Sequence, residues 1–563
     1  MNEDAFEGLH NLRSLYLSKN SRYPVDENLS LPKNVFKYLV NLTVLDLSYN
    51  NIDSLHEETL NGLLNLQQLK LNNNLLKELP NDSFQYTPKL AILDLSNNFL
   101  NNVTEGVFNG LRNLHHLYLN GNYMRNIQNN AFISLINLTD LNLLTNTLNY
   151  VNEQIFAGLP KLRHLYLGSN CIKEISNNTF GNMTDLKLLD LSKNSLSSLN
   201  EKTFIGLRRL EDLRLNLNLF KYNTKQLPPG CFQPLESLKH LSVQMNNPQN
   251  VPDTYILPDE TIKDLKKLKT LELDVNFAKE RILGIGFSSL YNLSSLVFSS
   301  YSKFSLLNDT FRYTTNLTHF SCKKCNIMIL ETGTFLFLTQ LKFVLLDFVC
   351  PVSYDPHQVI HIILSMSKTP VEILEINNVD IKVFFTWKKV NYILLDTRIR
   401  ELHITNKDRC VRKTSIFPIE KVLPTPVSLQ SLDLSSNGIL QIGLNLTYVI
   451  FLDLSNNELD DFLEEYSYAM NGISRLEYIC LSNNLIKHLI SKLFINQPRL
   501  RIIDLSFNKL TNVSFELTHL VDLEILNVSS NTIRYLDDGS MKNIDRLFEI
   551  SKSVKVDLSN NTF

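Results

Sequence analysis

Histidine recurs at one position of a repeated strand motif in this chain, and it is the side chain that titrates nearest to neutral pH. The placement indicates a row of imidazoles on one face of a sheet, which is the chemistry of a pH sensor. The histidines do not fall on adjacent repeats, so cooperative protonation is only weakly supported and a structural role is favoured. The four residues are His116, His164, His240 and His319.

Aspartate recurs in the string LDLS and its close variants. A row of carboxylates is one way to supply acid–base catalysis, but these residues occupy a consensus strand position that faces solvent. Nucleophile elbows and glycine-rich phosphate loops are absent from the sequence. We therefore predict that the chain is not an enzyme and has no catalytic residues, no metal site and no cofactor. The aspartates are Asp46, Asp94, Asp190, Asp433, Asp453, Asp504 and Asp557.

A 24-residue repeat positions these side chains. Segments with the pattern LxxLxLxxN, typical of leucine-rich repeats, begin at Leu66, Leu90, Leu114, Leu138, Leu162, Leu186 and Leu210. Each LxL should be a short strand with inward leucines, and no repeat can fold without its neighbours. The predicted fold class is an α/β-type leucine-rich repeat solenoid: a curved horseshoe with a concave parallel β-sheet and a mostly irregular or short-helical convex side.

Two further residue types recur in the repeats, and we expect both to have structural roles. The asparagine that ends the motif should turn the chain and satisfy backbone groups of the adjacent coil. A phenylalanine six residues before each strand motif should stack into an aromatic spine under the convex side. The structural asparagines are Asn50, Asn74, Asn98, Asn122, Asn146, Asn170 and Asn194, and the spine residues include Phe84, Phe108, Phe132, Phe156, Phe180 and Phe204.

Beyond the regular repeats the register continues, but the asparagine ladder is interrupted. Later motifs start at Leu238, Leu268, Leu293, Leu317, Leu341, Val371, Ile399, Leu429, Val449, Leu476, Leu500, Leu523 and Ser553. The asparagine position is lost from Tyr301 to Lys407 and returns at Asn437. We therefore expect one solenoid over 1–563, with a regular arm at 1–292, an irregular, ladder-poor centre at 293–428 and a regular C-terminal arm at 429–563.

Composition agrees with an elongated folded body. Charged residues make up 20% and hydrophobic residues 44% of the chain, and the net charge is −2. That balance gives no general attraction to nucleic acid or to anionic membranes. Apolar stretches are far shorter than the roughly 20 residues of a membrane span. Because neither end carries a signal segment or a capping element, we expect a fragment that lacks its caps, its membrane span and any intracellular domain.

The phenylalanine-bearing repeats, the LDLSxN strands and the ladder-poor centre between two regular arms together resemble a Toll-like receptor ectodomain. The closing LNVSSNTIRYL and VDLSNNTF resemble the last repeats of that family. The resemblance covers essentially the whole chain. It implies an innate immune pattern-recognition receptor, a glycoprotein that binds a microbial product or a protein ligand and forms homo- or heterodimers to trigger inflammatory signal transduction.

The same resemblance implies a location and a ligand preference. The natural protein would be a single-pass membrane protein facing the extracellular side, with the endosomal lumen as an alternative. Nucleic-acid sensors of the family carry a long inserted loop for which the spacings here leave no room, so the resemblance disfavours nucleic acid. A leucine-rich repeat adhesion or secreted matrix protein without a signalling domain stays open as the alternative.

The chain has seven cysteines, whose pairing would indicate the cellular compartment of the protein. The only close pair, Cys322 and Cys325, has no second metal-ligand pair nearby, which argues against a zinc site. In the repeat register Cys325 stacks on Val349, so Cys350 should lie beside it at about the 4.8 Å spacing of paired strands. We therefore predict a Cys325–Cys350 disulfide, with Cys322–Cys350 as the alternative pairing.

N-glycosylation acceptors of the form N-x-[ST] also indicate the secretory route. An asparagine-rich chain yields many such sequons by chance, so the signal is modest. Asn527 and Asn560 also match, but Asn527 should lie on the concave face, where a glycan would obstruct a ligand. The predicted acceptors are Asn28, Asn41, Asn81, Asn102, Asn137, Asn177, Asn182, Asn292, Asn308, Asn316, Asn445 and Asn512.

The ladder-poor coils carry an unusual density of apolar residues at non-consensus positions. Such residues could line a pocket for an acyl chain, where each buried CH₂ contributes about 0.8 kcal/mol. The core of an irregular stretch without any cavity is the alternative. The predicted ligand-binding residues are Phe343, Leu345, Phe348, Val349, Val352, Ile381, Phe384 and Phe385.

Overall fold

A computed structural model gives the fold as two compact units. Unit 1 comprises Met1–Val275 and Leu283–Leu293, and unit 2 comprises Asn276–Ile282 and Ser294–Phe563. The structure describes residues 3–20, 29–246, 254–255, 259–277, 283–300, 303–349, 358–379, 392–406, 415–416, 426–441, 446–460, 472–551 and 553–563.

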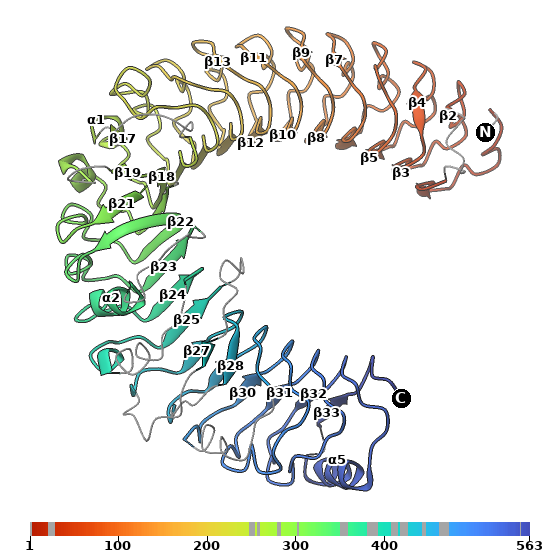
Figure 1. The fold of residues 1–563 in the computed structure, drawn as a ribbon. Helices are drawn as coiled ribbons and strands as arrows, with labels where there is room; N and C mark the ends of the chain where they lie inside the picture. The colour runs from red at the N-terminus through yellow and green to blue at the C-terminus, as the bar shows by residue number, and fades with distance from the viewer. Residues whose placement is uncertain are drawn as a thin grey trace. The chain divides into compact units, whose positions relative to one another are not determined.

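Unit 1 is built around a parallel sheet of short strands that lines its inner side (Figure 1). Consecutive strands pair leucine opposite leucine, as Leu141 does with Leu117 and Leu165. The strands are β1 (Ser14–Tyr16), β3 (Val44–Asp46), β5 (Gln68–Lys70), β6 (Ile92–Asp94), β8 (His116–Tyr118), β10 (Asp140–Asn142), β12 (His164–Tyr166), β14 (Leu188–Asp190), β15 (Asp212–Arg214), β16 (His240–Ser242) and β18 (Thr270–Asp274).

The outer side of unit 1 carries short elements in its described part. They are the paired strands β2 (Leu29–Ser30) and β4 (Ile52–Ser54), β7 (Asn102–Val103) and β9 (Asn126–Ile127), β11 (Tyr150–Val151) and β13 (Glu174–Ile175), together with β17 (Thr254–Tyr255), helix α1 (Asp259–Ile262) and the 3₁₀ helix η1 (Ile285–Ser289).

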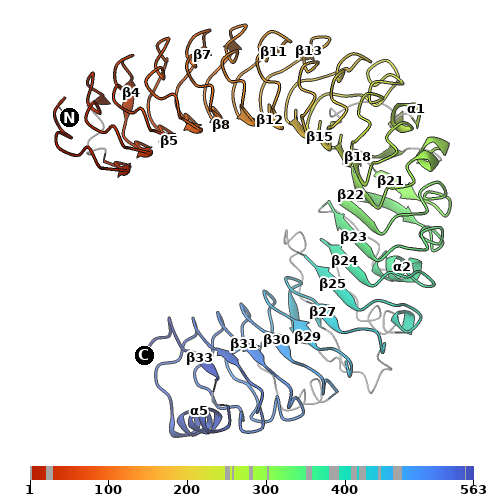
Figure 2. The ribbon, with the colours of Figure 1, turned by 180° about the vertical axis from the view of Figure 1, so that it is seen from behind.

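Unit 2 repeats the plan with longer strands in its first half, and its sheet also lies on its inner side (Figure 2). The sheet strands are β20 (Ser295–Ser299), β21 (Lys303–Leu306), β22 (His319–Leu330), β23 (Phe343–Phe348), β24 (Ile373–Asn377), β25 (Glu401–Thr405), β27 (Ser431–Asp433), β29 (Phe451–Asp453), β30 (Tyr478–Cys480), β31 (Ile502–Asp504), β32 (Ile525–Asn527) and β33 (Lys555–Asp557). The other elements are β19 (Asn276–Phe277), β26 (Ser415–Ile416), β28 (Ile439–Gln441), α2 (Gln358–Ser365) and α5 (Asp538–Ile550).

With the exception of β21, each inner-sheet strand from β5 onward begins two residues after the predicted start of its motif. Side chains alternate along each strand, so the residue between the two outward positions points into the core. Leu69, Leu141 and Ile503 occupy this middle position and are fully buried. Burying one such side chain contributes about 1.5–3 kcal/mol. The predicted fold class, a parallel-sheet leucine-rich repeat solenoid with few helices, is confirmed for the described residues.

The asparagines named above lie buried and bond to the preceding coil in unit 1. Asn98 is a representative case, with 2% of its surface exposed. Its Oδ1 accepts a hydrogen bond from the backbone N–H of Leu76 at 3.1 Å, and its Nδ2 donates to the carbonyls of Leu71 and Leu95 at 2.9 and 3.1 Å. Because both ends of the amide are used, one side chain satisfies backbone groups of its own coil and of the preceding coil.

At the last strand of unit 1 an aspartate takes over this role. Asp274 accepts from the backbone N–H groups of Met245 and Asn246 at 2.5 and 2.6 Å. In the motif that starts at Leu268, the residue at the asparagine position is Asn276. The carboxylate of Asp274, two residues earlier, reaches the backbone donors of the preceding coil from the end of the longer strand β18.

Phenylalanines stack between the outer segments of neighbouring coils. The Phe84–Phe108 ring centroids lie 6.1 Å apart with an interplanar angle of 17°, and Phe108–Phe132 lie 5.9 Å apart at the same angle. Phe156 and Phe180 form a similar pair, as do Phe204 and Phe232. These rings are almost completely buried, so they fill the outer part of these coils, where the described residues form no helix.

Helix α5 is the longest helix among the described residues and lies on the outer side of the last coils (Figures 1 and 2). It begins after Asp537, whose side chain accepts a hydrogen bond from the Ser540 N–H at 2.7 Å, the usual N-cap arrangement. The division into a regular arm, an irregular centre and a second regular arm stays a prediction.

Candidate functional site

The outward face of the unit 1 sheet carries a histidine–aspartate–histidine cluster. Strands β8, β10 and β12 are consecutive, and their registers place Asp140 directly between His116 and His164. Asp140 Oδ2 lies 3.1 Å from His116 Nδ1, and Asp140 Oδ1 lies 2.6 Å from His164 Nδ1. One carboxylate therefore joins two histidines that the sequence places on alternate repeats.

The electrostatics of the cluster centre on Asp140. Burial would raise the pKa of Asp140, but hydrogen bonds from Thr139 and His164 outweigh it, so its pKa lies below the ordinary value. Burial, and then the negative charge of Asp140, raise the pKa of both Tyr118 and Tyr166, which are the second outward residues of β8 and β12. The face thus offers two neutral phenols and two imidazoles around one anion.

Sequence reasoning missed Asp140 as part of this arrangement. The sequence does contain a signal for it. Asp140 occupies the same motif position as His116 and His164, and its repeat lies between theirs. His240 and His319 lie at the same strand position but outside the cluster. His319 contacts the Thr318 hydroxyl at 2.8 Å and packs near the Phe343 ring, with centroids 5.8 Å apart.

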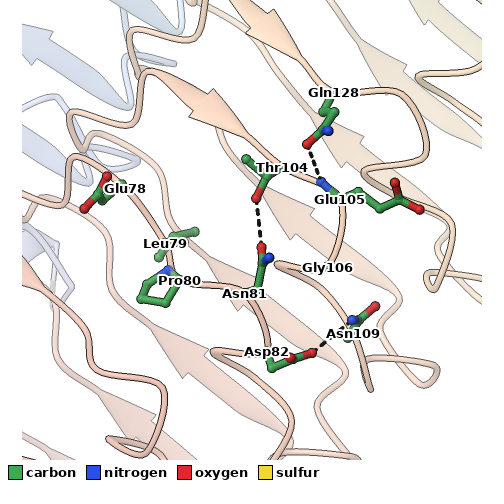
Figure 3. Close-up of a pocket in the computed structure, with 10 residues that line it drawn as sticks. All are labelled: Glu78, Leu79, Pro80, Asn81, Asp82, Thr104, Glu105, Gly106, Asn109 and Gln128. Atoms are coloured by element: carbon green, nitrogen blue, oxygen red, sulfur yellow. Dashed lines mark hydrogen bonds between the residues drawn. The ribbon is translucent and has the colours of Figure 1, made fainter.

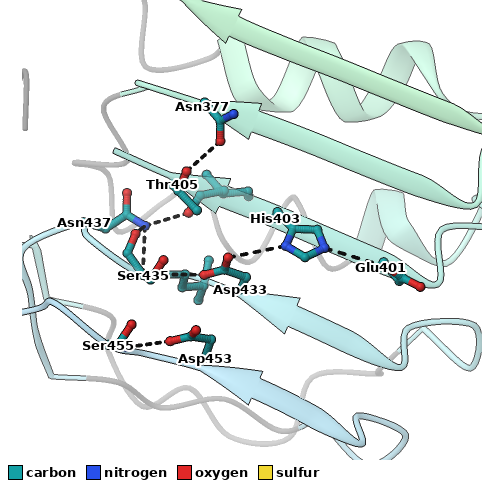
Figure 4. A network of polar contacts seen from close by, with 11 residues as sticks. Asn377, Glu401, His403, Thr405, Asp433, Ser435, Asn437, Asp453 and Ser455 are labelled. Carbon is teal, nitrogen blue, oxygen red and sulfur yellow. Dashed lines mark hydrogen bonds and ion pairs between the residues drawn. The ribbon is translucent and has the colours of Figure 1, made fainter. Parts of the chain in front are cut away.

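A second polar network occupies unit 2, where the asparagine ladder resumes (Figure 4). His403 Nδ1 lies 3.4 Å from Asp433 Oδ2, and His403 Nε2 lies 3.9 Å from Glu401 Oε2. The hydrogen bond to Asp433 raises the pKa of His403 against the effect of burial. Burial raises the pKa of Asp433, but hydrogen bonds from His403 and Ser435 bring it below the ordinary value.

The same region shows how the coils stack without regular asparagines. Thr405 Oγ1 donates to Asn377 Oδ1 at 2.6 Å, and Asn378 Nδ2 donates to Asp347 Oδ1 at 2.9 Å. Asn437 restarts the ladder by donating to the carbonyl of Ile404 at 2.6 Å. Its own Oδ1 is buried and finds no donor among the described residues. Side-chain pairs therefore replace the ladder in these coils.

The predicted apolar ligand site lies only partly within the described residues. Phe343 and Leu345 are the half-buried outward residues of β23, Phe348 is buried at its end, and Val349 follows half-buried. Val352, Ile381, Phe384 and Phe385 lie outside the described residues. The acyl-chain site therefore stays a prediction.

The predicted Cys325–Cys350 disulfide is wrong, because the structure joins Cys325 to Cys322. The Cα atoms of the bonded pair lie 5.8 Å apart, within the range that a disulfide spans. The register of β22 against β23 shifts between the two cysteines, so both side chains are buried on the same side, and Cys325 lies opposite Phe348. The prediction assumed an unbroken repeat register, in which Cys325 stacks on Val349. Cys350 lies outside the described residues.

Most predicted glycosylation acceptors that the structure describes are accessible. Asn137 and Asn512 are half-buried, and Asn28 and Asn445 lie outside the described residues. Occupancy of any acceptor stays a prediction. The exposed acceptors are Asn41, Asn81, Asn102, Asn177, Asn182, Asn292, Asn308 and Asn316.

A polar hollow of 810 Å³ lies between coils of unit 1, away from the sheet (Figure 3). Its walls are tied together by hydrogen bonds from Thr104 to Asn81 at 3.0 Å and from Asn109 to Asp82 at 2.9 Å. None of its lining residues is basic, and Asn81 is a predicted glycosylation acceptor. The hollow does not suit an acyl chain or a phosphate group. It is lined by Glu78, Leu79, Pro80, Asn81, Asp82, Thr104, Glu105, Gly106, Asn109 and Gln128.

The described residues show neither a metal-binding cluster nor a membrane-spanning helix. Histidine, cysteine, aspartate and glutamate do not gather there in a group of three or more that could hold a metal ion. Within that part of the chain, every helix is too short or too polar to cross a membrane.

Comparison with known families identifies the repeat. Six copies of a BspA type leucine rich repeat region match residues 29–163, and a leucine rich repeat model matches residues 165–220 and 474–533. Lumican from Oryctolagus cuniculus is 32% identical over 170 residues, covering 29% of this chain and 77% of that protein. The chain belongs to the leucine-rich repeat family.

Other relatives match over part of their length. Lumicans from Rattus norvegicus and Homo sapiens are each 30% identical over 198 residues, or 33% of this chain, and the match spans 56% of their own length. A solved structure described as a TLR13–ssRNA13 complex is similar over 99% of this chain and 86% of that chain, with a TM-score of 0.55 and 21% sequence identity. At that identity the likeness concerns the fold.

Proposed function

We propose that this chain is the ligand-binding ectodomain of a Toll-like pattern-recognition receptor. The observation that carries the proposal is the interruption of the asparagine ladder. The ladder is regular in unit 1. In unit 2, side-chain pairs such as Thr405–Asn377 replace it until it resumes at Asn437. The likeness to the TLR13 structure along nearly the whole chain supports it. In this role the ectodomain binds a microbial product or a protein ligand and pairs with a second copy or a related receptor.

The proposal includes a location. The full-length protein is anchored in a membrane, with this region on the extracellular side or in the endosomal lumen. The exposed sequons support passage through the secretory route. Signalling then requires an intracellular domain that ligand-induced pairing brings together, as in innate immune and inflammatory responses.

Single-stranded RNA belongs among the ligands to test. The sequence disfavoured nucleic acid, but the comparisons give that expectation no support, since the similar TLR13 structure is described as a complex with ssRNA13. Tyr118 and Tyr166 offer rings on which bases can stack, and His116 and His164 lie beside them on the same face of the sheet. A lipid-bearing ligand at the predicted apolar residues is the competing class.

The test joins the chain to a membrane span and a Toll/interleukin-1 receptor-type signalling domain in reporter cells. Cells are exposed to single-stranded RNA, a diacylated lipopeptide or a secreted protein preparation. We expect one class to induce the reporter. A double His116→Ala, His164→Ala variant should lose an RNA response, and Phe343→Ser should lose a lipopeptide response. Val44→Ser, an outward substitution on β3 that is adjacent to neither site, is the matched control.

A secreted or adhesion protein of the extracellular matrix is the second candidate. The observation that favours it is the 30% identity to lumican over 198 residues. In this role the chain acts without a signalling domain. Retention on an extracellular-matrix preparation, together with a silent reporter in cells that display the fusion on their surface, would favour this candidate over the receptor.

A further inference from the structure

The outward side chains of the last strands of unit 2 form an unbroken apolar stripe. The registers of β29 to β32 place four apolar residues side by side, and we call them the C-terminal stripe: Phe451, Tyr478, Ile502 and Ile525. The rings of Phe451 and Tyr478 stack with centroids 4.4 Å apart and an interplanar angle of 6°. Ile525 keeps 36% of its surface exposed, so the stripe faces solvent.

A row of carboxylates runs beside this stripe at the second outward position of each strand. We call Asp433, Asp453, Asp504 and Asp557 the acidic row; Cys480 and Asn527 occupy the same position on β30 and β32. Each carboxylate uses Oδ1 to accept a backbone N–H two residues on, as Asp453 does from Ser455 at 2.8 Å and Asp504 from Ser506 at 2.9 Å. Oδ2 takes no part in that turn.

The charges of the acidic row are not neutralised at its centre. Among the described residues, no lysine or arginine forms an ion pair with Asp453 or Asp504. Burial raises the pKa of Asp453, and the neighbouring Asp433 and Asp504 raise it further. A cation placed over the row would relieve this repulsion.

The opposite border of the stripe differs, because its charges pair with one another. Arg501 lies 3.8 Å from Glu477 and 2.7 Å from Glu524, measured between nitrogen and oxygen atoms. The face therefore presents an apolar strip with the acidic row along one side and, along the other, two glutamates that share one arginine. A complementary ligand needs an apolar surface flanked by positive charge.

We propose that this face of unit 2 binds a protein partner through an amphipathic, basic α-helix laid across strands β29 to β32. Successive turns of an α-helix lie about 5.4 Å apart, and paired strands lie about 4.8 Å apart. Across four strands the mismatch between helix turns and strands therefore stays within about 2 Å. The apolar face of the helix covers the C-terminal stripe, and lysines or arginines on the adjoining face meet the acidic row. The carboxylates repel nucleic acid and anionic lipid.

The inference goes beyond the proposed function, because it requires neither a microbial ligand nor a signalling domain. One residue needs control in any test. Asn527 lies in line with the acidic row and is part of an N-x-S sequon, with its Oδ1 accepting from the N–H and the hydroxyl of Ser529 at 3.1 and 2.7 Å. A glycan there would cover the face. Asn527→Asp removes the acceptor and adds a carboxylate to the row.

The experiment titrates the full chain carrying Asn527→Asp with a fluorescent synthetic helical peptide that has leucines on one face and lysines beside them. Anisotropy should report binding that weakens as salt is added. Asp453→Asn and Asp504→Asn should each weaken binding about three- to fivefold, and Ile502→Ser about tenfold. Binding to the same peptide with glutamates in place of lysines should be absent.

Unit 1 supplies matched controls. Asp94 also accepts from the serine two residues on, at 3.0 Å from its N–H, and Ile92 is the outward residue of the same strand. Asp94→Asn and Ile92→Ser should leave peptide binding unchanged. The proposal is overturned if the lysine peptide does not bind, if the glutamate peptide binds as well, or if correctly folded Asp453→Asn and Ile502→Ser proteins bind like the parent.

Discussion

At the scale of single residues, polar side chains stabilise this protein mainly by satisfying the backbone of the neighbouring coil. Asn98 bonds to four backbone groups, two of which belong to the preceding coil. His403 bonds instead to a carboxylate on the next strand, Asp433. The first kind of contact is independent of pH over the physiological range, whereas the second depends on the protonation of the imidazole.

Asn98→Ala should destabilise unit 1 by about 2–3 kcal/mol, because buried backbone groups lose their partners and cannot reach water. Chemical denaturation followed by fluorescence measures the change as a lower midpoint. The exposed neighbour Asn101 supplies the control substitution Asn101→Ala, which should change the midpoint little. Equal midpoints for Asn98→Ala and the parent would contradict the ladder's energetic role.

His403→Gln should destabilise the protein more in acid than in alkali. The folded-state pKa of His403 lies above the ordinary value of about 6.5, so its contribution is fully present below the unfolded pKa and is lost as the pH rises through the folded pKa. Thermal melts across this range should show a difference of about 1 kcal/mol at low pH that shrinks at high pH. His361→Gln, exposed on α2, is the control; a difference that grows with pH would refute the argument.

Cysteine reactivity should divide by exposure. Cys171 is an exposed free thiol, while burial raises the pKa of Cys231 to about 12. Alkylation of the native protein followed by mass spectrometry should label Cys171 readily and Cys231 only after unfolding, because the thiolate is the reactive form. Non-reducing peptide mapping should recover Cys322 linked to Cys325; recovery of a Cys325–Cys350 peptide would reinstate the pairing expected from the sequence.

At the scale of elements, the coil is held from two sides, by the leucines of its strand and by the phenylalanine of its outer segment. Leu117 and Phe108 belong to one such coil and are both almost fully buried. In the described part of unit 1, the outer side carries only two short helices, α1 and η1. The aromatic ring therefore fills the outer part of the coil.

Phe108→Ala should therefore cost about 3–5 kcal/mol through the cavity it leaves between Phe84 and Phe132. The midpoint of chemical denaturation reports the loss. Phe99 also stacks on an aromatic ring, that of Tyr123, but it is 44% exposed. Phe99→Ala should consequently cost far less, and similar losses for the two variants would argue against the spine as a core element.

At the scale of the whole molecule, the two units share one architecture, and the asparagine ladder of unit 1 returns in the last coils of unit 2. Far-ultraviolet circular dichroism should show a weak helical signal, since α5 is the only helix longer than α2's eight residues among the described elements. A spectrum dominated by helix would contradict the solenoid.

The amino-acid sequence by itself determined the repeat, because a short strand, a turn asparagine and a spine phenylalanine each have a local signature that recurs with a fixed period. Strand positions followed to within two residues, since the motifs that start at Leu341 and Leu500 contain β23 and β31, which begin at Phe343 and Ile502. The side chains that meet across neighbouring coils depend on register, which is a tertiary property. The repeat register predicted that Cys325 would stack on Val349 beside Cys350, yet a local shift in register places Cys325 opposite Phe348, and it bonds to Cys322. Likewise, Asp140 joins His116 to His164 only because three separate coils pack in line.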